Sequence, residues 1–165
     1  MSAGLHIGVV SDSHGSLPSL ERAFEAMQPI ELLLHAGDYC RDARAFAKKR
    51  RLQAEWVCGN CDMEFNTPEE RVLHLMGHTI LLTHGHRYNV KRTMDELCAR
   101  ASELKADVCV FGHTHIPLLE RIGDCLFLNP GSPHVPRTGI PTCANLYVER
   151  GTAPQAWIHT LTAQM

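Results

Sequence analysis

The sequence predicts one α/β domain, residues 1–165, in which two β-sheets pack together and helices cover their outer faces. In the first two thirds of the chain, short apolar runs typical of buried strands alternate with amphipathic helical stretches. The remainder has short strands separated by turns, without helical stretches. A length of 165 residues, 44% of them hydrophobic and 21% charged, suits a single domain with a sizeable core.

Strands and helices are expected to alternate at the start of the chain. Strands are predicted over residues 5–10, 32–35 and 54–58, and helices over 17–27 and 42–52. The first helix has apolar residues at helical spacing: Leu17, Leu20, Phe24 and Met27. Ser16 and Pro18 are typical of a helix start, and Pro29 of a helix end.

The middle of the chain is predicted to form a loop over 63–70 and then a hairpin. The arms of the hairpin, 71–76 and 79–83, flank Gly77-His78. The longest helix is expected over 90–105, with one apolar stripe along it. Further strands are predicted over residues 107–111, 118–121, 125–128, 144–149 and 155–161.

Residues able to bind metal follow one predicted strand after another. The stretch Leu32–Asp38 shows the pattern, since an apolar run ends in a histidine, a glycine and an acid. Open α/β sheets bind ligands at the carboxyl ends of their strands. The donors placed there are Asp12, His14, Asp38, Asn60, His84, His113 and His115. A mixture of oxygen donors and imidazoles suits Mn, Fe, Ni or Zn, and seven donors suit two ions that share a carboxylate.

These motifs resemble those of the calcineurin-like metallophosphoesterases. They occur in that family's order: Asp12-Ser13-His14, Gly37-Asp38, Gly59-Asn60-Cys61-Asp62, Thr83-His84-Gly85-His86 and Gly112-His113-Thr114-His115. The small size and the downstream Asn129-Pro130-Gly131-Ser132 are similar to the YfcE-type phosphodiesterase branch. The resemblance therefore covers nearly the whole chain.

The resemblance implies a four-layer α/β/β/α sandwich of the metallo-dependent phosphatase type. It places one divalent transition-metal ion on Asp12, His14 and His115, and another on Asn60, His84 and His113, with Asp38 as the bridge. It also implies a phosphodiesterase in which a hydroxide between the ions attacks phosphorus in line, with Asp38, Asn60 and His113 as catalytic residues. Mn is the first expectation for the metal, with Ni, Fe or Zn as alternatives.

Three further residues are predicted to touch substrate. His35 lines the site or supports Asp38 from behind, and His86 contacts substrate or packs within its loop. Cys61 stands where many relatives have a histidine that protonates the leaving alcohol, although the small branch commonly has cysteine there. We expect activity to survive and to favour good leaving groups, particularly diesters. Specificity is expected to depend on loops around residues 39–42, 61–68, 86–90 and 132–141.

Two other patterns, a pair of cysteines and a basic run, are not expected to have a function of their own. Cys58-Gly-Asn-Cys61 has the spacing of a redox motif, but such a motif should open a helix, whereas this one lies in a strand-end loop. The basic run Lys48–Arg51 is expected to be a solvated helix face.

Composition limits the remaining functions. A net charge of -2 argues against nucleic acid as a stable partner, and no apolar run is long enough for a membrane span. No signal peptide is visible at the N-terminus, and scattered cysteines suit a reducing compartment, so a cytoplasmic protein is expected. The partner is expected to be a small phosphodiester or phosphomonoester, with a homodimer left open. The rival interpretation is a non-catalytic metal-binding or protein-interaction scaffold of the same fold, as in a retromer subunit; the complete donor set favours the enzyme.

Overall fold

The computed structural model describes residues 3–162, which form two mixed five-stranded sheets and three α-helices. The first sheet has the order β10-β9-β1-β2-β3. Its strands are β1 (Gly4–Val10), β2 (Leu32–His35), β3 (Gln53–Trp56), β9 (Thr142–Glu149) and β10 (Gln155–Thr160). The second sheet has the order β4-β5-β6-β8-β7. Its strands are β4 (Glu70–Leu75), β5 (His78–Thr83), β6 (Val108–Val110), β7 (Leu118–Ile122) and β8 (Cys125–Asn129).

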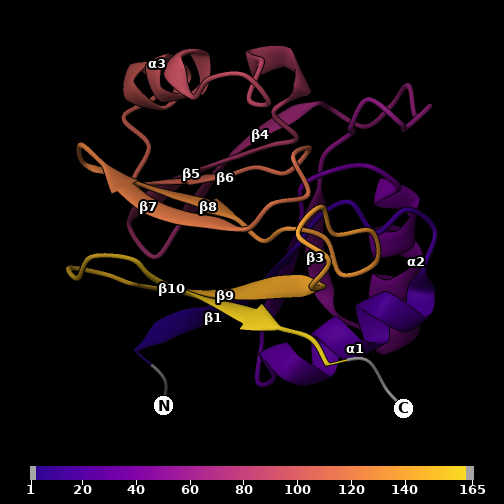
Figure 1. Cartoon of the computed structure of the whole chain (residues 1–165). Coiled ribbons are helices and arrows are strands. Elements are labelled where there is room, and N and C mark those ends of the chain that lie inside the picture. The colour runs from indigo at the N-terminus through magenta and orange to yellow at the C-terminus, as the bar shows by residue number, and fades with distance from the viewer. Residues whose placement is uncertain (1–2, 163–165) are drawn as a thin grey trace.

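Three separate apolar clusters confirm the four-layer sandwich. One fills the space between the sheets and includes Val9, Leu34 and Leu128, each 0% exposed. A second lies between the first sheet and the helices α1 (Leu17–Met27) and α2 (Cys40–Arg50). The third lies between the second sheet and α3 (Asp95–Glu103). Figure 1 shows α3 above one sheet and α1 and α2 against the other.

Parallel pairing brings the predicted donor loops to one edge of the sandwich. Strands β1, β2 and β3 pair in parallel, as do β5, β6 and β8. Parallel strands end at the same edge of a sheet, so the loops that follow them are neighbours. This arrangement places donors 100 residues apart in sequence within reach of one another.

Helix α1 follows its sequence signals closely. It begins at Leu17 after Ser16, whose side chain accepts a hydrogen bond from the amide of Ser19 at 3.2 Å. This bond satisfies one of the amides that a helix start leaves unpaired. The helix ends at Met27, two residues before Pro29, as predicted.

The helix predicted over 90–105 is shorter than expected. Only Asp95–Glu103 is helical, nine residues against eleven in α1 and in α2, so the prediction of the longest helix is wrong. A short 3₁₀ turn, η1 (His86–Tyr88), ends at Asn89 in the left-handed region, with φ of 56°. Turns follow it, in which the amides of Arg92 and Thr93 both donate to the carbonyl of Asn89, and the helix begins only at Asp95; Val90 still packs against the third cluster.

Other boundaries shift by one or two residues. Strand β3 ends at Trp56 rather than at residue 58, because the amide of Cys58 donates to the carbonyl of Pro68 instead of to β2. Helix α2 starts at Cys40, two residues early. The hairpin β4–β5 is present with the expected antiparallel pairing.

The structure does not describe residues 1, 2 and 163–165. Both ends of the predicted domain 1–165 therefore lie outside the described residues, as does the start of the N-terminal segment to which the signal-peptide prediction refers. Within residues 3–162, no helix is both long and apolar enough to cross a membrane.

Candidate metal centre

Two groups of metal-capable side chains meet at the carboxyl ends of the strands and share one residue. The first group is Asp12, His14, Asp38 and His115, and the second is Asp38, His84 and His113. Within each group, one donor atom per residue lies within 4.8 Å of all the others. Asp38 belongs to both groups, so its carboxylate stands between them.

Asp38 is almost fully buried, 2% exposed, and its position is fixed from several directions. The amide of Cys61 donates to its Oδ1 at 2.9 Å, and His84 Nε2 lies 3.4 Å from the same oxygen. Burial would raise the pKa of this carboxyl, but the hydrogen bond and charge of His84 and the Cys61 bond lower the pKa overall. The carboxylate is therefore ionised and available as a ligand.

Two buried atoms of the first group have no well-formed hydrogen bond. Among the described residues, neither Asp12 Oδ1 nor His14 Nε2 makes a well-formed hydrogen bond, and the two atoms lie 3.9 Å apart, with His115 Nε2 at 3.2 Å from the same Asp12 oxygen. An unpaired buried carboxylate oxygen is costly unless a cation or donor faces it. A divalent ion between these atoms satisfies both, so the residues fit a metal.

Two of the histidines are oriented by backbone carbonyls. The Nδ1 atoms of His84 and His115 donate to the carbonyls of Ala36 and Val135, each at 2.7 Å. In a neutral ring the remaining nitrogen, Nε2, then carries a lone pair. Against the effect of burial, Asp38 and Asp12 raise the pKa of His84, and the hydrogen bond to Asp12 raises the pKa of His115. A metal ion would take the place of the proton on each Nε2, and the backbone partner fixes the tautomer.

Asn60 completes the second group. Its Oδ1 lies 3.0 Å from His84 Nε2, which is also near Asp38. Three acceptor atoms that converge in this way require a positive charge, supplied by a proton on His84 or by a metal ion. Burial and the nearby His84 lower the pKa of His113 to about 4, so that ring is neutral and able to coordinate.

The backbone of the centre is tightly constrained. Asp12, Asp38, His113 and His115 all have φ between 57° and 71°, a region that non-glycine residues seldom occupy. A Cβ on Gly59 would lie only 2.2 Å from Asp38 Oδ1. The loops therefore approach more closely than a side chain there would permit.

A family model for the calcineurin-like phosphoesterase superfamily domain matches residues 5–151. The match covers the whole centre and both sheets apart from β10 and the first residue of β1. The chain belongs to the calcineurin-like phosphoesterase superfamily.

Curated members of the superfamily match over most of their length. A probable metallophosphoesterase of Methanothermobacter thermautotrophicus is 35% identical, with 87% of this chain and 86% of that protein covered. The phosphodiesterase YfcE of Escherichia coli is 32% identical, with 79% and 80% covered. The chain is therefore a phosphoesterase-family protein whose relatives include a named phosphodiesterase.

Solved structures show the same fold. A predicted phosphoesterase from Streptococcus pneumoniae has a TM-score of 0.78 and 26% identity, and covers 96% of this chain and 100% of its own. Vacuolar protein sorting 29 of Cryptosporidium parvum has a TM-score of 0.75 but 21% identity, with 98% and 100% covered, so that likeness concerns the fold alone.

His35 does not fit the predicted contact with substrate. Its side chain is 0% exposed, and both ring nitrogens are occupied: Nδ1 accepts from the amide of Gly37 at 3.1 Å, and Nε2 bonds to Ser13 Oγ at 2.8 Å. Of the two roles left open, the structure favours support of the Asp38 loop. The cause is the alternation of residues between the two faces of β2: Leu34 packs between the sheets, whereas Leu33, and with it His35, lies on the face covered by α1 and α2.

Cys61 and His86 lie beside the centre, Cys61 next to Asp38 and His86 next to His84. Cys61 is exposed and, with Tyr39, Arg41, Asp62 and Met63, lines a cleft of about 280 Å³. The ring centroid of His86 lies 5.3 Å from that of His84, and its Nδ1 has no partner among the described residues. The cleft leaves room for a ligand beside Cys61. All seven cysteines are free thiols, and Cys58 and Cys61 form no disulfide.

Three supporting residues have no predicted role in the sequence. Asp42 Oδ2 accepts from Ser13 Oγ and from the Gly15 amide, at 2.7 and 2.8 Å. Asp62 accepts from the amides of Asp38, Cys40 and Gly59. Ser132 Oγ donates to the carbonyl of Asp12 at 2.8 Å. Asp62 and Ser132 each end a motif of the family resemblance, and this was their only signal in the sequence. Asp42 had no signal, because it looks like an ordinary acid in the first turn of a helix.

Proposed function

We propose that this chain is a phosphodiesterase that uses two divalent transition-metal ions. The observation that carries the proposal is the sharing of Asp38 by two groups of donors. One ion would be held by Asp12, His14 and His115, the other by Asn60, His84 and His113, with Asp38 as ligand to both. Two ions that share a carboxylate are the arrangement that suits hydrolysis of phosphate esters.

The ions would supply a water of lowered pKa and positive charge to balance the phosphate oxygens. The protein's own contribution is to hold the donors in place. Asp38, Asn60 and His113 are the residues we place in direct contact with the reacting region. The neutral His113 ring and the Asn60 amide add no negative charge that would repel the phosphate.

Manganese is the metal we propose, with nickel, iron or zinc as alternatives. Carboxylate, amide and imidazole donors suit all of these ions, and supply in the cell decides among them. Calcium and magnesium fit less well, because they prefer sites made of oxygen alone.

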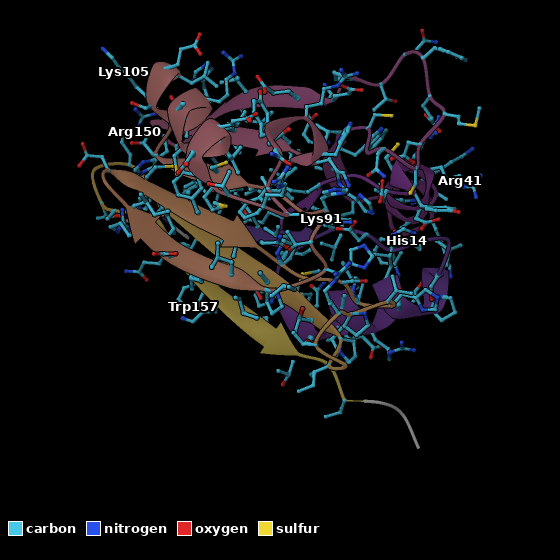
Figure 2. All side chains as sticks on the ribbon, turned by 45° about the horizontal axis from the view of Figure 1, so that its top comes forward. His14, Arg41, Lys91, Lys105, Arg150 and Trp157 are labelled. Carbon is cyan, nitrogen blue, oxygen red and sulfur yellow. The ribbon has the colours of Figure 1, made fainter. Side chains whose placement is uncertain are left out.

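The test is hydrolysis of a chromogenic diester, bis(p-nitrophenyl) phosphate, by protein stripped of metal and reloaded with Mn²⁺. We expect turnover that depends on Mn²⁺ and falls by at least about 100-fold in Asp38→Ala, since residues merely behind a metal ligand already cost about 10–100-fold. Replacement of Lys105, an exposed lysine far from the centre, is the matched control (Figure 2).

Equal rates with and without metal would overturn the enzymatic proposal. Metal binding without turnover on diesters and monoesters would instead favour a scaffold of the same fold.

A further inference from the structure

A second cleft lies beside the loop that carries His113 and His115. It has a volume of about 290 Å³. Its lining comes from the segment before α3, the loop after β6, and the loop after β8: Val90, Lys91, Met94, Phe111, Thr114, Ile116, Pro117, Leu118, Asn129 and Arg137. Residues 90 and 137 belong to two of the loops expected to control specificity.

The backbone joins this cleft to the metal centre. Thr114 lies between His113 and His115, one from each donor group. The amide of Arg137 donates to the carbonyl of His115 at 3.1 Å. A group bonded to a phosphate at the centre would therefore be adjacent to the cleft.

The floor of the cleft is apolar. Phe111 is 1% exposed and Val90 7% exposed, and both belong to the cluster beneath α3. Ile116, at 42% exposure, gives the rim an apolar wall. Such a surface gains free energy by covering an aromatic ring or a short aliphatic chain. The volume of about 290 Å³ is just below the roughly 300–1,000 Å³ of small-molecule sites, so the cleft admits one ring rather than a nucleotide.

The charge of the cleft has one sign. Lys91 and Arg137 are its only charged residues, and both are exposed. Neither makes an ion pair or a side-chain hydrogen bond within residues 3–162, in contrast to Arg44, Arg87 and Arg100, which pair with glutamates. Two unpaired cations beside an apolar floor complement a group with an apolar body and an anionic end.

We infer that this cleft binds one ester arm of the substrate, an aromatic or short aliphatic group that carries a carboxylate or phosphate. The inference rests on the proposed phosphodiesterase function and adds a substrate class to it. Lys91 and Arg137 are the specificity-determining residues, and the metal centre acts on the phosphorus that the arm is bonded to.

The test compares two diesters that release the same product, p-nitrophenyl phenyl phosphate and p-nitrophenyl 3-carboxyphenyl phosphate. In each, water adds to phosphorus, the bond to p-nitrophenolate breaks and an aryl phosphate remains. We expect the wild type to have a kcat/KM about 3- to 10-fold higher for the carboxylated diester, the range that one or two exposed ion pairs support. Lys91→Glu and Arg137→Glu should each abolish or reverse this ratio.

Two controls separate the cleft from general effects. Lys105→Glu introduces the same change of charge at the far end of the molecule from His14, whereas Lys91 lies between them (Figure 2), and it should leave the ratio unchanged. About 1 M salt should reduce the wild-type preference, because the Debye length shrinks to about 3 Å.

The outcomes are distinguishable. Hydrolysis of both diesters at equal kcat/KM, unaffected by Lys91→Glu and Arg137→Glu, would overturn the inference and leave the proposed function intact. No metal-dependent hydrolysis of either diester would overturn both. A preference that Lys105→Glu reduces as strongly would show a general charge effect and also overturn the inference.

Discussion

At the scale of single residues, Asp38 differs from every other donor because both donor groups include it. Its carboxylate also receives the Cys61 amide, which fixes its orientation before any ion binds. His84 contributes to one group only. The two residues should therefore differ in what their removal does to the metal content.

We expect Asp38→Asn to lower the affinity for both ions, and His84→Asn to lower mainly that of the second group. The neutral amide keeps the shape of the carboxylate but removes the charge that two cations share. Elemental analysis after equilibrium dialysis against Mn²⁺ measures bound ions per chain. Equal loss of metal in the two variants would contradict the shared role of Asp38.

The thiol of Cys61 stands beside the proposed reacting region, where a proton donor to the leaving group is useful. We expect Cys61→His to raise kcat on the monoester phenyl phosphate about 10-fold, since well-placed acid catalysis contributes about 100- to 10,000-fold. Bis(p-nitrophenyl) phosphate, with its good leaving group, should gain much less. Cys61→Ser, which has no comparable donor, is the control; an unchanged substrate profile would count against the idea.

At the scale of elements, α2 supports a loop that it does not belong to. Asp42, in its first turn and 6% exposed, accepts from Ser13 and from the Gly15 amide on either side of His14. His35, at the end of β2, bonds to the same Ser13 hydroxyl. Helix α2 and strand β2 thus hold the loop that presents Asp12 and His14.

We expect Asp42→Asn to lower the affinity for Mn²⁺ by about 10-fold, because a neutral amide oxygen accepts the two loop bonds more weakly than the charged carboxylate oxygen does, so the donors are held less firmly. Titration calorimetry measures this affinity directly. Asp124→Asn, in the exposed turn between β7 and β8, is the matched control and should bind as the wild type does. Full affinity in Asp42→Asn would show that the loop is held by other contacts.

At the scale of the whole molecule, the centre joins the two sheets. Donors from loops after β1, β2 and β3 meet donors from loops after β5 and β6. Ions bound there would connect the layers at one edge, in addition to the apolar cluster between them. Binding to the native state alone raises the free energy of unfolding.

Chelation should therefore lower the melting temperature of the Mn²⁺-loaded protein. With free metal at about 100 times its Kd the gain is about 2.7 kcal/mol, which corresponds to about 5–10 °C for a domain of this size. Thermal unfolding followed by circular dichroism, with and without EDTA, measures the shift. Asp38→Asn should melt at the same temperature in both conditions; a wild type insensitive to EDTA would mean that the ions do not bind selectively to the native state.

The sequence by itself determined the fold class and the types of donor. Strand runs such as Leu32–His35 and the hairpin at Gly77 depend on local periodicity and turn chemistry, which a sequence displays directly. The donors could be predicted because parallel strands must end together, so residues that follow them must meet.

Tertiary structure alone decided how those residues face one another. The family resemblance implied that Asp38 is shared, but the geometry of that sharing, the burial of His35 and the support from Asp42 depend on the packing of segments far apart in the chain. The turn closed on the Asn89 carbonyl, which takes the place of the first part of the predicted helix, was not visible in the local pattern. The cleft with Lys91 and Arg137 likewise exists only after β6, β8 and the segment before α3 are brought together, since its walls come from all three.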